Sequence, residues 1–157
     1  MGNIEHMVAA AENSWNEKDE IEENCPQKCT CDHSTAFCSN QQQMYLPTSL
    51  PAHVTTLEFQ NNYLDALDRD LCGNFIYIGS IMLDENQIRN VDTEAFKACK
   101  NLKKLTLSSN LIKDIAPAQF DDLNKLEILD LRNGFNCDRY LKLQIALFHK
   151  LLACERR

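Results

Sequence analysis

The sequence predicts an α/β solenoid, a short curved arc of stacked 24-residue units that is capped at both ends. Three observations lead to this fold class. Aliphatic residues recur every 24 positions, two positions in each unit alternate as in a short strand, and an asparagine follows each strand at a fixed distance. We expect the strands to stack into a parallel sheet on the concave side, with an irregular or 3₁₀ convex side.

The repeat is regular over three full units, without an inserted or a lost residue. The first strand column contains Leu57, Ile81, Leu105 and Leu129, and the column two positions later contains Phe59, Leu83, Leu107 and Leu131. Such alternation is typical of a strand with one buried face. The remainder of each unit is too short for a long helix, and Pro117 also favours an extended or 3₁₀ return.

An asparagine column follows the strands at Asn62, Asn86 and Asn110. A side-chain amide at this position can bond to backbone groups of neighbouring units, which would otherwise be buried without a partner. We therefore expect these three residues to form a ladder.

Each unit reads L-x-x-L-x-L-x-x-N-x-L-x-x-L, where L is an aliphatic residue or Phe. This pattern resembles that of leucine-rich-repeat proteins over residues 46–136, and we assign the repeats proper to residues 54–131. The resemblance implies a solenoid whose concave sheet docks protein ligands.

Residues 25–53 precede the first repeat with the spacing C-x3-C-x-C-x6-C and two prolines, Pro47 and Pro51. This segment resembles the N-terminal cysteine-rich cap of extracellular leucine-rich-repeat proteins such as small leucine-rich proteoglycans, Slit-like proteins and innate-immune receptors. The resemblance implies the pairs Cys25–Cys31 and Cys29–Cys38. A zinc site is the alternative, but the spacing is not that of a C-x2-C knuckle.

Residues 132–157 are predicted to form a reduced C-terminal cap. The segment from Asn133 to Asp138 resembles the family's N-P-W-x-C-D motif, with Gly134 in place of Pro and Phe135 in place of Trp. An apolar stripe predicts a helix over Tyr140 to Cys154 that covers the last repeat, and Cys137–Cys154 is the expected disulfide.

Two further cysteines, Cys72 and Cys99, fall on convex-side columns of adjacent units. They either form a disulfide or fill the core as small apolar side chains.

Charge is unevenly distributed. Residues 1–24 contain seven acidic residues and one lysine, so they account for six of the seven net negative charges. We expect this segment to be a disordered, solvated tail, or alternatively a docking segment for a basic partner or Ca²⁺. The nearly neutral remainder argues against nucleic acid as a partner, and no apolar run is long enough to span a membrane.

Eight cysteines predict disulfides and an extracellular location, as a secreted protein or a receptor ectodomain, although the chain shows no signal peptide. We find no catalytic set, metal site or cofactor motif, and so expect a binding module rather than an enzyme. The predicted partner is an unidentified protein, and the chain is expected to be a monomer or weak homodimer. A structural or self-associating matrix protein is the alternative.

The predicted ligand-binding residues are those that alternate with the buried strand positions and point to the concave side. They are Glu58, Gln60, Met82, Asp84, Lys104, Thr106, Ser108, Ile128, Asp130 and Arg132. Because these residues lack an aromatic side chain, Met82, Ile128 and Arg132 are the candidate anchors. The caps or the convex side are the other candidate surfaces.

Overall fold

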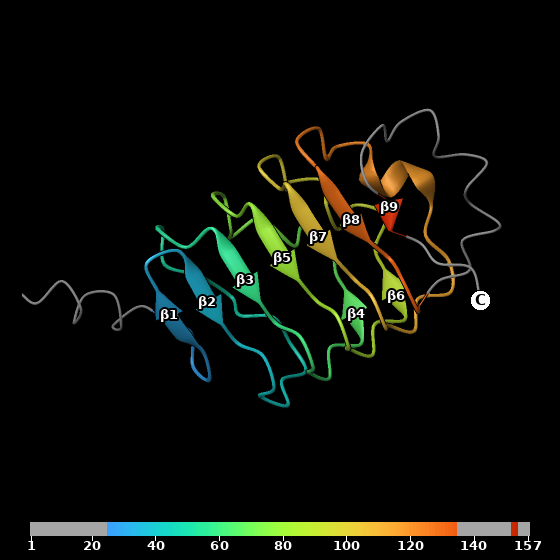
Figure 1. The fold of residues 1–157 in the computed structure, drawn as a ribbon. Helices are drawn as coiled ribbons and strands as arrows, with labels where there is room; N and C mark the ends of the chain where they lie inside the picture. Colours follow the sequence, from blue (N-terminus) through green and yellow to red (C-terminus); the bar gives the residue numbers. More distant parts are fainter. Residues whose placement is uncertain (1–24, 135–151, 154–157) are drawn as a thin grey trace, which may run out of the picture.

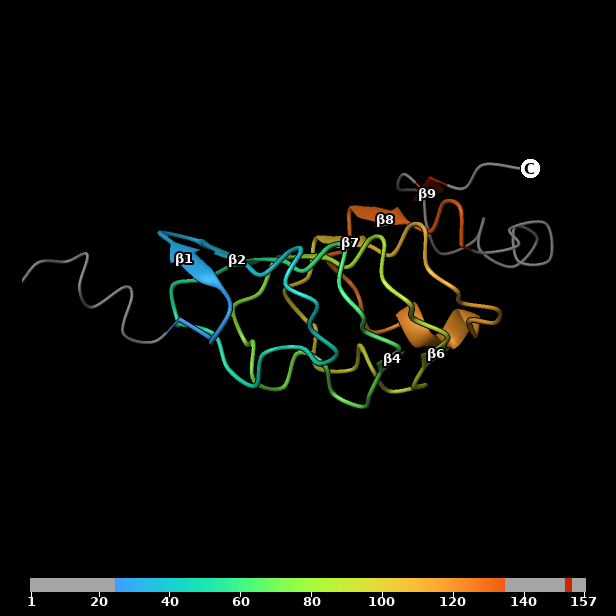
Figure 2. The ribbon, with the colours of Figure 1, turned by 90° about the horizontal axis from the view of Figure 1, so that it is seen from below.

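The structure is a computed structural model, and it describes residues 25–134 and 152–153. Within this part the chain winds as a solenoid with a sheet of seven strands along one side (Figure 1). Return segments, which include a second sheet of two strands, run along the opposite side (Figure 2). The two layers enclose one hydrophobic core.

The large sheet has the order β1-β2-β3-β5-β7-β8-β9. Its strands are β1 (Thr30–Asp32), β2 (Thr35–Phe37), β3 (Thr56–Glu58), β5 (Ser80–Met82), β7 (Lys104–Thr106), β8 (Ile128–Asp130) and β9 (Leu152–Ala153). β1 and β2 form an antiparallel hairpin, and every later pair is parallel. Leu57 lies opposite Ile81, which lies opposite Leu105, so the register follows the 24-residue period. The predicted parallel sheet is confirmed.

The convex side contains β4 (Ala66–Leu67), β6 (Asn90–Val91) and the 3₁₀ segment η1 (Pro117–Phe120). β4 and β6 pair in parallel. No α-helix occurs between residues 25 and 134, which agrees with the predicted irregular or 3₁₀ return. Pro117 begins η1, where its fixed φ is compatible with a helical turn.

The core follows the repeat columns. Leu57, Ile81 and Leu105 are fully buried beneath the sheet. From the convex side Phe96 stacks on Phe120, with ring centroids 5.6 Å apart. Burial of each such side chain contributes roughly 1.5–3 kcal/mol, so stacking of the units is the main source of stability.

The asparagine ladder is present. Asn86 donates from Nδ2 to the carbonyls of Phe59 (3.0 Å) and Leu83 (3.1 Å), and its Oδ1 accepts from the amide of Leu64 (3.1 Å). Asn110 repeats this pattern one unit later, and Asn62 makes the corresponding bonds to the cap. Each amide thereby ties two neighbouring turns of the solenoid together.

A left-handed turn precedes each ladder position. Asn61, Glu85, Ser109 and Asn133 have φ values of 53°, 56°, 55° and 57°. Glycine and asparagine tolerate this region of φ, whereas the backbone of Glu85 and Ser109 is strained there. The turn sends the chain from the sheet into the core, where the next residue joins the ladder.

The ladder ends at Gly134, which lies 24 positions after Asn110. A Cβ atom at Gly134 would lie 2.7 Å from the carbonyl oxygen of Asn110 and 2.9 Å from its nitrogen. Backbone therefore packs directly on backbone at the last unit, and only glycine fits.

Three disulfides lie within the described residues. Cys25 is bonded to Cys31 and Cys29 to Cys38, which are the pairs that the resemblance implied for the cap. Cys72 is bonded to Cys99, so of the two readings of this pair the disulfide is the one present. Both cysteines are also buried in the core, where the bond joins two adjacent turns.

The predicted C-terminal helix needs a correction. Leu152 and Ala153 are not helical but form β9, which pairs in parallel with β8. The physical reason is that β8 offers unpaired backbone groups at the edge of the sheet, which an added strand can satisfy. The rest of the predicted helix and the pair Cys137–Cys154 lie outside the described residues, as does the acidic segment 1–24.

Candidate functional site: the concave sheet

All ten predicted ligand-binding residues lie on one face of the large sheet, which we call the concave face. Strand pairing arranges them in rows across the units. The middle row is Phe37, Glu58, Met82, Thr106 and Asp130. The row at the amino ends of the strands is Thr35, Thr56, Ser80, Lys104 and Ile128, and a third row just beyond the strands includes Gln60, Asp84, Ser108 and Arg132.

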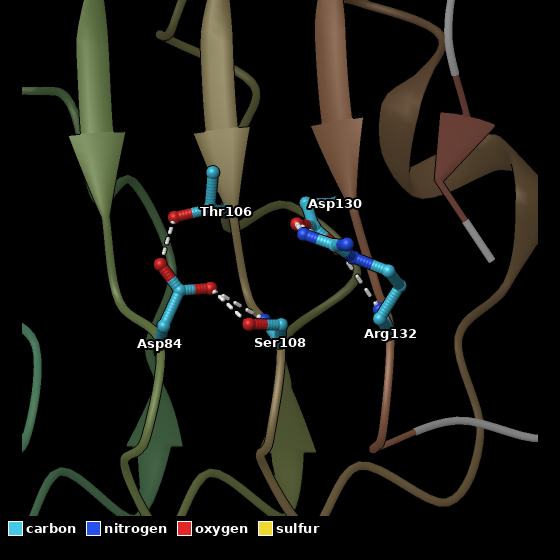
Figure 3. A network of polar contacts seen from close by, with 5 residues as sticks. All are labelled: Asp84, Thr106, Ser108, Asp130 and Arg132. Carbon is cyan, nitrogen blue, oxygen red and sulfur yellow. Dashed lines mark hydrogen bonds and ion pairs between the residues drawn. The ribbon is translucent and has the colours of Figure 1, made fainter. Parts of the chain in front are cut away.

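Asp84 organises the centre of this face (Figure 3). Its carboxylate accepts hydrogen bonds from the hydroxyl of Thr106, from the backbone N–H of Ser108 (2.8 Å) and from the hydroxyl of Ser108 (2.6 Å). Asp84 follows β5, while Thr106 and Ser108 belong to the next unit. The carboxylate therefore crosslinks two turns of the solenoid on its outer side, as the asparagine ladder does on the inner side.

A second polar pair lies one unit further on. Arg132 donates to the carboxylate of Asp130 from Nε (3.0 Å) and from an Nη atom (2.7 Å), and its backbone N–H also bonds to Asp130 (3.0 Å). This two-point contact fixes the direction of the guanidinium group.

The ionisation of Asp130 depends on this pair. Burial by itself would raise the pKa of Asp130, but the hydrogen bonds from Arg132 and the positive charges of Arg132 and Lys104 hold the pKa below its ordinary value of 3.8. Because the pKa is lower in the folded chain, the pair stabilises the fold above the ordinary pKa. This contribution is lost as the pH falls through the lowered pKa.

Two of the predicted contact residues are not exposed. Thr106 is 7% exposed and Asp130 is 8% exposed. The sequence predicts Thr106 as a ligand-binding residue, but the residue is buried and its hydroxyl donates to the carboxylate of Asp84. Thr106 and Asp130 position other residues of the face, and the eight remaining predicted residues are half-buried or exposed.

Phe37 is an aromatic residue of the concave face that sequence reasoning missed. It lies opposite Glu58 at the end of the middle row and is 41% exposed. The repeat pattern could not reveal it, because β2 belongs to the cap and its distance to β3 is not the repeat period. The available signal was that Phe37 lies between two small residues, Ala36 and Cys38, which are both buried. In a strand this alternation places Phe37 on the outer face.

The carboxyl ends of the strands border an acidic groove of about 530 Å³. Its charged lining residues are Glu58, Asp84 and Glu85, and Gln60 and Ser108 supply polar groups. No group of three metal-ligating side chains of the kind that holds a metal occurs among the described residues. The charged side chains that line the groove are therefore all acidic.

The comparisons with known proteins agree with this fold. Residues 78–134 match the family model described as "Leucine rich repeat". Human Leucine-rich repeat-containing protein 3B is 27% identical over 118 residues, which cover 73% of this chain and 45% of that protein. Human Amphoterin-induced protein 1 is 33% identical over 83 residues, which cover 52% of this chain and 17% of that protein.

Among solved structures, the crystal structure of human 5T4 (Wnt-activated inhibitory factor 1, Trophoblast glycoprotein) superimposes with a TM-score of 0.65 at 26% identity. The match covers 80% of this chain and 48% of that chain. This chain thus spans about half of the trophoblast glycoprotein structure and less than half of Leucine-rich repeat-containing protein 3B.

The fold and the concave face define a solenoid that serves generally as a protein-interaction module. This chain is similar to leucine-rich-repeat proteins, with the family model matched over residues 78–134, and it has a disulfide-bonded N-terminal cap. The three disulfides within residues 25–134 indicate an oxidising environment. Over residues 25–134 and 152–153, no helix is both long and apolar enough to span a membrane.

Proposed function

We propose that this chain is an extracellular recognition module that binds a protein ligand through its concave face and catalyses no reaction. The observation that carries the proposal is the preformed face itself. Asparagine amides and the Asp84 network hold its rows from both sides of the sheet, so little conformational entropy is lost when a partner docks.

The middle row supplies the apolar anchors. Phe37 and Met82 flank Glu58, and Phe37 is 41% exposed. Aromatic residues and methionine are enriched at protein interfaces, whereas isolated polar residues on a sheet contribute little affinity. We therefore place the centre of the interface between β2 and β5, with ligand recognition in matrix, guidance or innate immunity as its context.

The test is affinity capture from extracellular fluid with the full chain as bait, followed by titration of the captured protein. The variant Phe37→Arg with Met82→Arg should abolish binding while its circular dichroism and melting temperature stay near those of the parent, since the new charges flank Glu58. The control Ala98→Arg with Asn124→Arg adds the same charge at exposed convex positions and should bind normally.

Loss of binding in the convex variant, with the concave variant unaffected, would move the interface to the other side of the solenoid. A concentration series in sedimentation addresses the structural alternative. The recognition proposal expects a monomer or weak dimer, whereas progressive self-assembly without a captured ligand would favour a self-associating matrix protein.

A further inference from the structure

A second groove lies at the amino ends of the strands, whereas the acidic groove lies at their carboxyl ends. It has a volume of about 500 Å³ and follows the amino ends of β3, β5 and β7. Its charged lining residues are Lys103, Lys104 and Lys125, and the lining contains no acidic residue. We call it the lysine groove.

None of these three lysines forms an ion pair within the described part of the chain. Within the described part of the chain, the ammonium groups of Lys103 and Lys104 make no hydrogen bond or ion pair, and Lys125 donates only to the Oδ1 atom of Asn101 at 2.7 Å. On the convex side Lys97 and Lys100 are instead paired with carboxylates. Lys104 acts on the carboxylate of Asp130 without a direct ion pair, so positive charge accumulates in this groove with little internal compensation, and an anion would relieve the repulsion.

An apolar border accompanies the lysines. Tyr77 lines the groove and is 56% exposed, and the adjacent Ile76 is 63% exposed. Asn101 donates from Nδ2 to the carbonyl of Ile76 at 2.9 Å, so the bonds from Lys125 through Asn101 hold this segment in place. An exposed tyrosine is a typical hot-spot residue of protein interfaces.

The length of the positively charged surface formed by Lys103, Lys104 and Lys125 indicates what kind of anion fits. Glu127, which is exposed, occupies the position of Lys103 in the next unit. The positively charged surface therefore ends after two units, and a long polyanion would have to run past a carboxylate. A short acidic segment avoids Glu127 and can also place an apolar side chain on Tyr77.

We propose that the lysine groove binds a short acidic segment of a protein partner, with an apolar residue of that segment packed on Tyr77. This inference rests on the proposed function, because it names the part of the concave side that recognises a particular chemistry. The acidic groove at the other ends of the strands repels such a segment, and the two grooves together fix the direction in which a partner lies.

The test uses random dodecapeptides displayed on phage and selected on the immobilised full chain. Selected sequences should be enriched in Asp and Glu beside an aromatic or branched aliphatic residue. The best peptide, once synthesised, should bind at least about tenfold more weakly to the variant Lys103→Gln, Lys104→Gln, Lys125→Gln, and binding should weaken with added salt. Tyr77→Ser should also weaken it.

The matched control is Lys97→Gln, Lys100→Gln, Lys113→Gln, which removes the same charge elsewhere and should stay within about twofold of the parent. Equal losses in both variants, an absence of acidic enrichment, or failure to select any peptide would overturn the lysine groove. Binding of a heparin decasaccharide with the same lysine dependence, but of no acidic peptide, would overturn it as well. Peptides that depend on Met82 instead would refute this inference alone and leave the proposed function standing.

Discussion

Single polar side chains that join neighbouring turns add to the stability of the packed core and hold the concave face in shape. Asn86 bonds to backbone groups of two units on the inner side of the sheet, and Asp84 bonds to the following unit on the outer side. Every buried side-chain nitrogen and oxygen in the described part of the chain has a hydrogen-bond partner. The removal of one such group therefore leaves others unpaired.

Asn86→Ala should destabilise the chain strongly. It leaves the amide of Leu64 without a partner, at about 1–3 kcal/mol, and it removes one of the two hydrogen bonds that the carbonyl of Phe59 accepts, the other coming from Asn62. Asn90→Ala, at an exposed position, should remain within about 0.5 kcal/mol. Urea unfolding of both variants measures the difference, and equal effects would refute the role of the ladder.

Glu85→Asn should stabilise the chain by about 0.5–1 kcal/mol, because asparagine tolerates the left-handed conformation that Glu85 adopts with φ at 56°. The same exchange at Glu127, which is exposed and has no positive φ, should give no gain. Thermal unfolding checks the pair. A loss of stability at position 85 would contradict the assigned strain.

The sequence predicted the ladder because Asn62, Asn86 and Asn110 recur with the period. It did not predict the left-handed column, whose members Asn61, Glu85 and Ser109 differ in residue type, nor the burial of Thr106. Side-chain hydrogen bonds between units depend on which rotamers meet across the strands, and the residue types at equivalent repeat positions do not determine those rotamers.

At the scale of elements, turns of the solenoid are joined covalently as well as by packing. The disulfide between Cys72 and Cys99 closes a loop with a sequence separation of 27 residues and joins two convex segments. Cys72 also occupies the column of Phe96 and Phe120, so the small side chain and its bond replace a phenylalanine there. Periodicity alone left this pair open because both cysteines also fit the core.

Cys72→Ala with Cys99→Ala should destabilise the chain by about 3–4 kcal/mol, the loop entropy expected for a crosslink of this length. The loss should disappear when parent and variant are compared under reducing conditions, apart from the small change in packing. Chemical denaturation with and without reductant measures it. An unchanged midpoint in the absence of reductant would show that the bond is not formed in solution.

Gly134→Ala should cost about 1–3 kcal/mol, because the added Cβ meets the backbone of Asn110 at 2.7 Å. Gly79→Ala is the control, since its Cβ would find the nearest atom at an ordinary 3.7 Å. Comparable melting temperatures for the two variants would contradict the close approach at the last unit.

The C-terminal end shows where prediction by pattern stops. An apolar stripe predicts a helix that includes Leu152, but this residue lies in β9 beside β8. The choice between helix and strand was decided by the free edge of the sheet, which is a property of the assembled solenoid and not of the local sequence. The repeat units were predictable because each unit contacts only adjacent units of the same pattern, so the sequence of a unit and its neighbours contains the information that fixes its structure.

At the scale of the whole molecule, the described residues form a disulfide-joined solenoid whose concave side carries an acidic groove at the carboxyl ends of the strands and a lysine groove at their amino ends. The disulfides indicate the kind of compartment in which this solenoid is stable. All six cysteines of the described residues are bonded, and such pairs persist only in an oxidising environment.

The most direct test of the extracellular recognition module is therefore peptide mapping under non-reducing conditions, with thiol counting, on the chain purified from its natural source. We expect the linked pairs Cys25–Cys31, Cys29–Cys38 and Cys72–Cys99. A count of eight free thiols, or zinc released in stoichiometric amounts by acid, would contradict it.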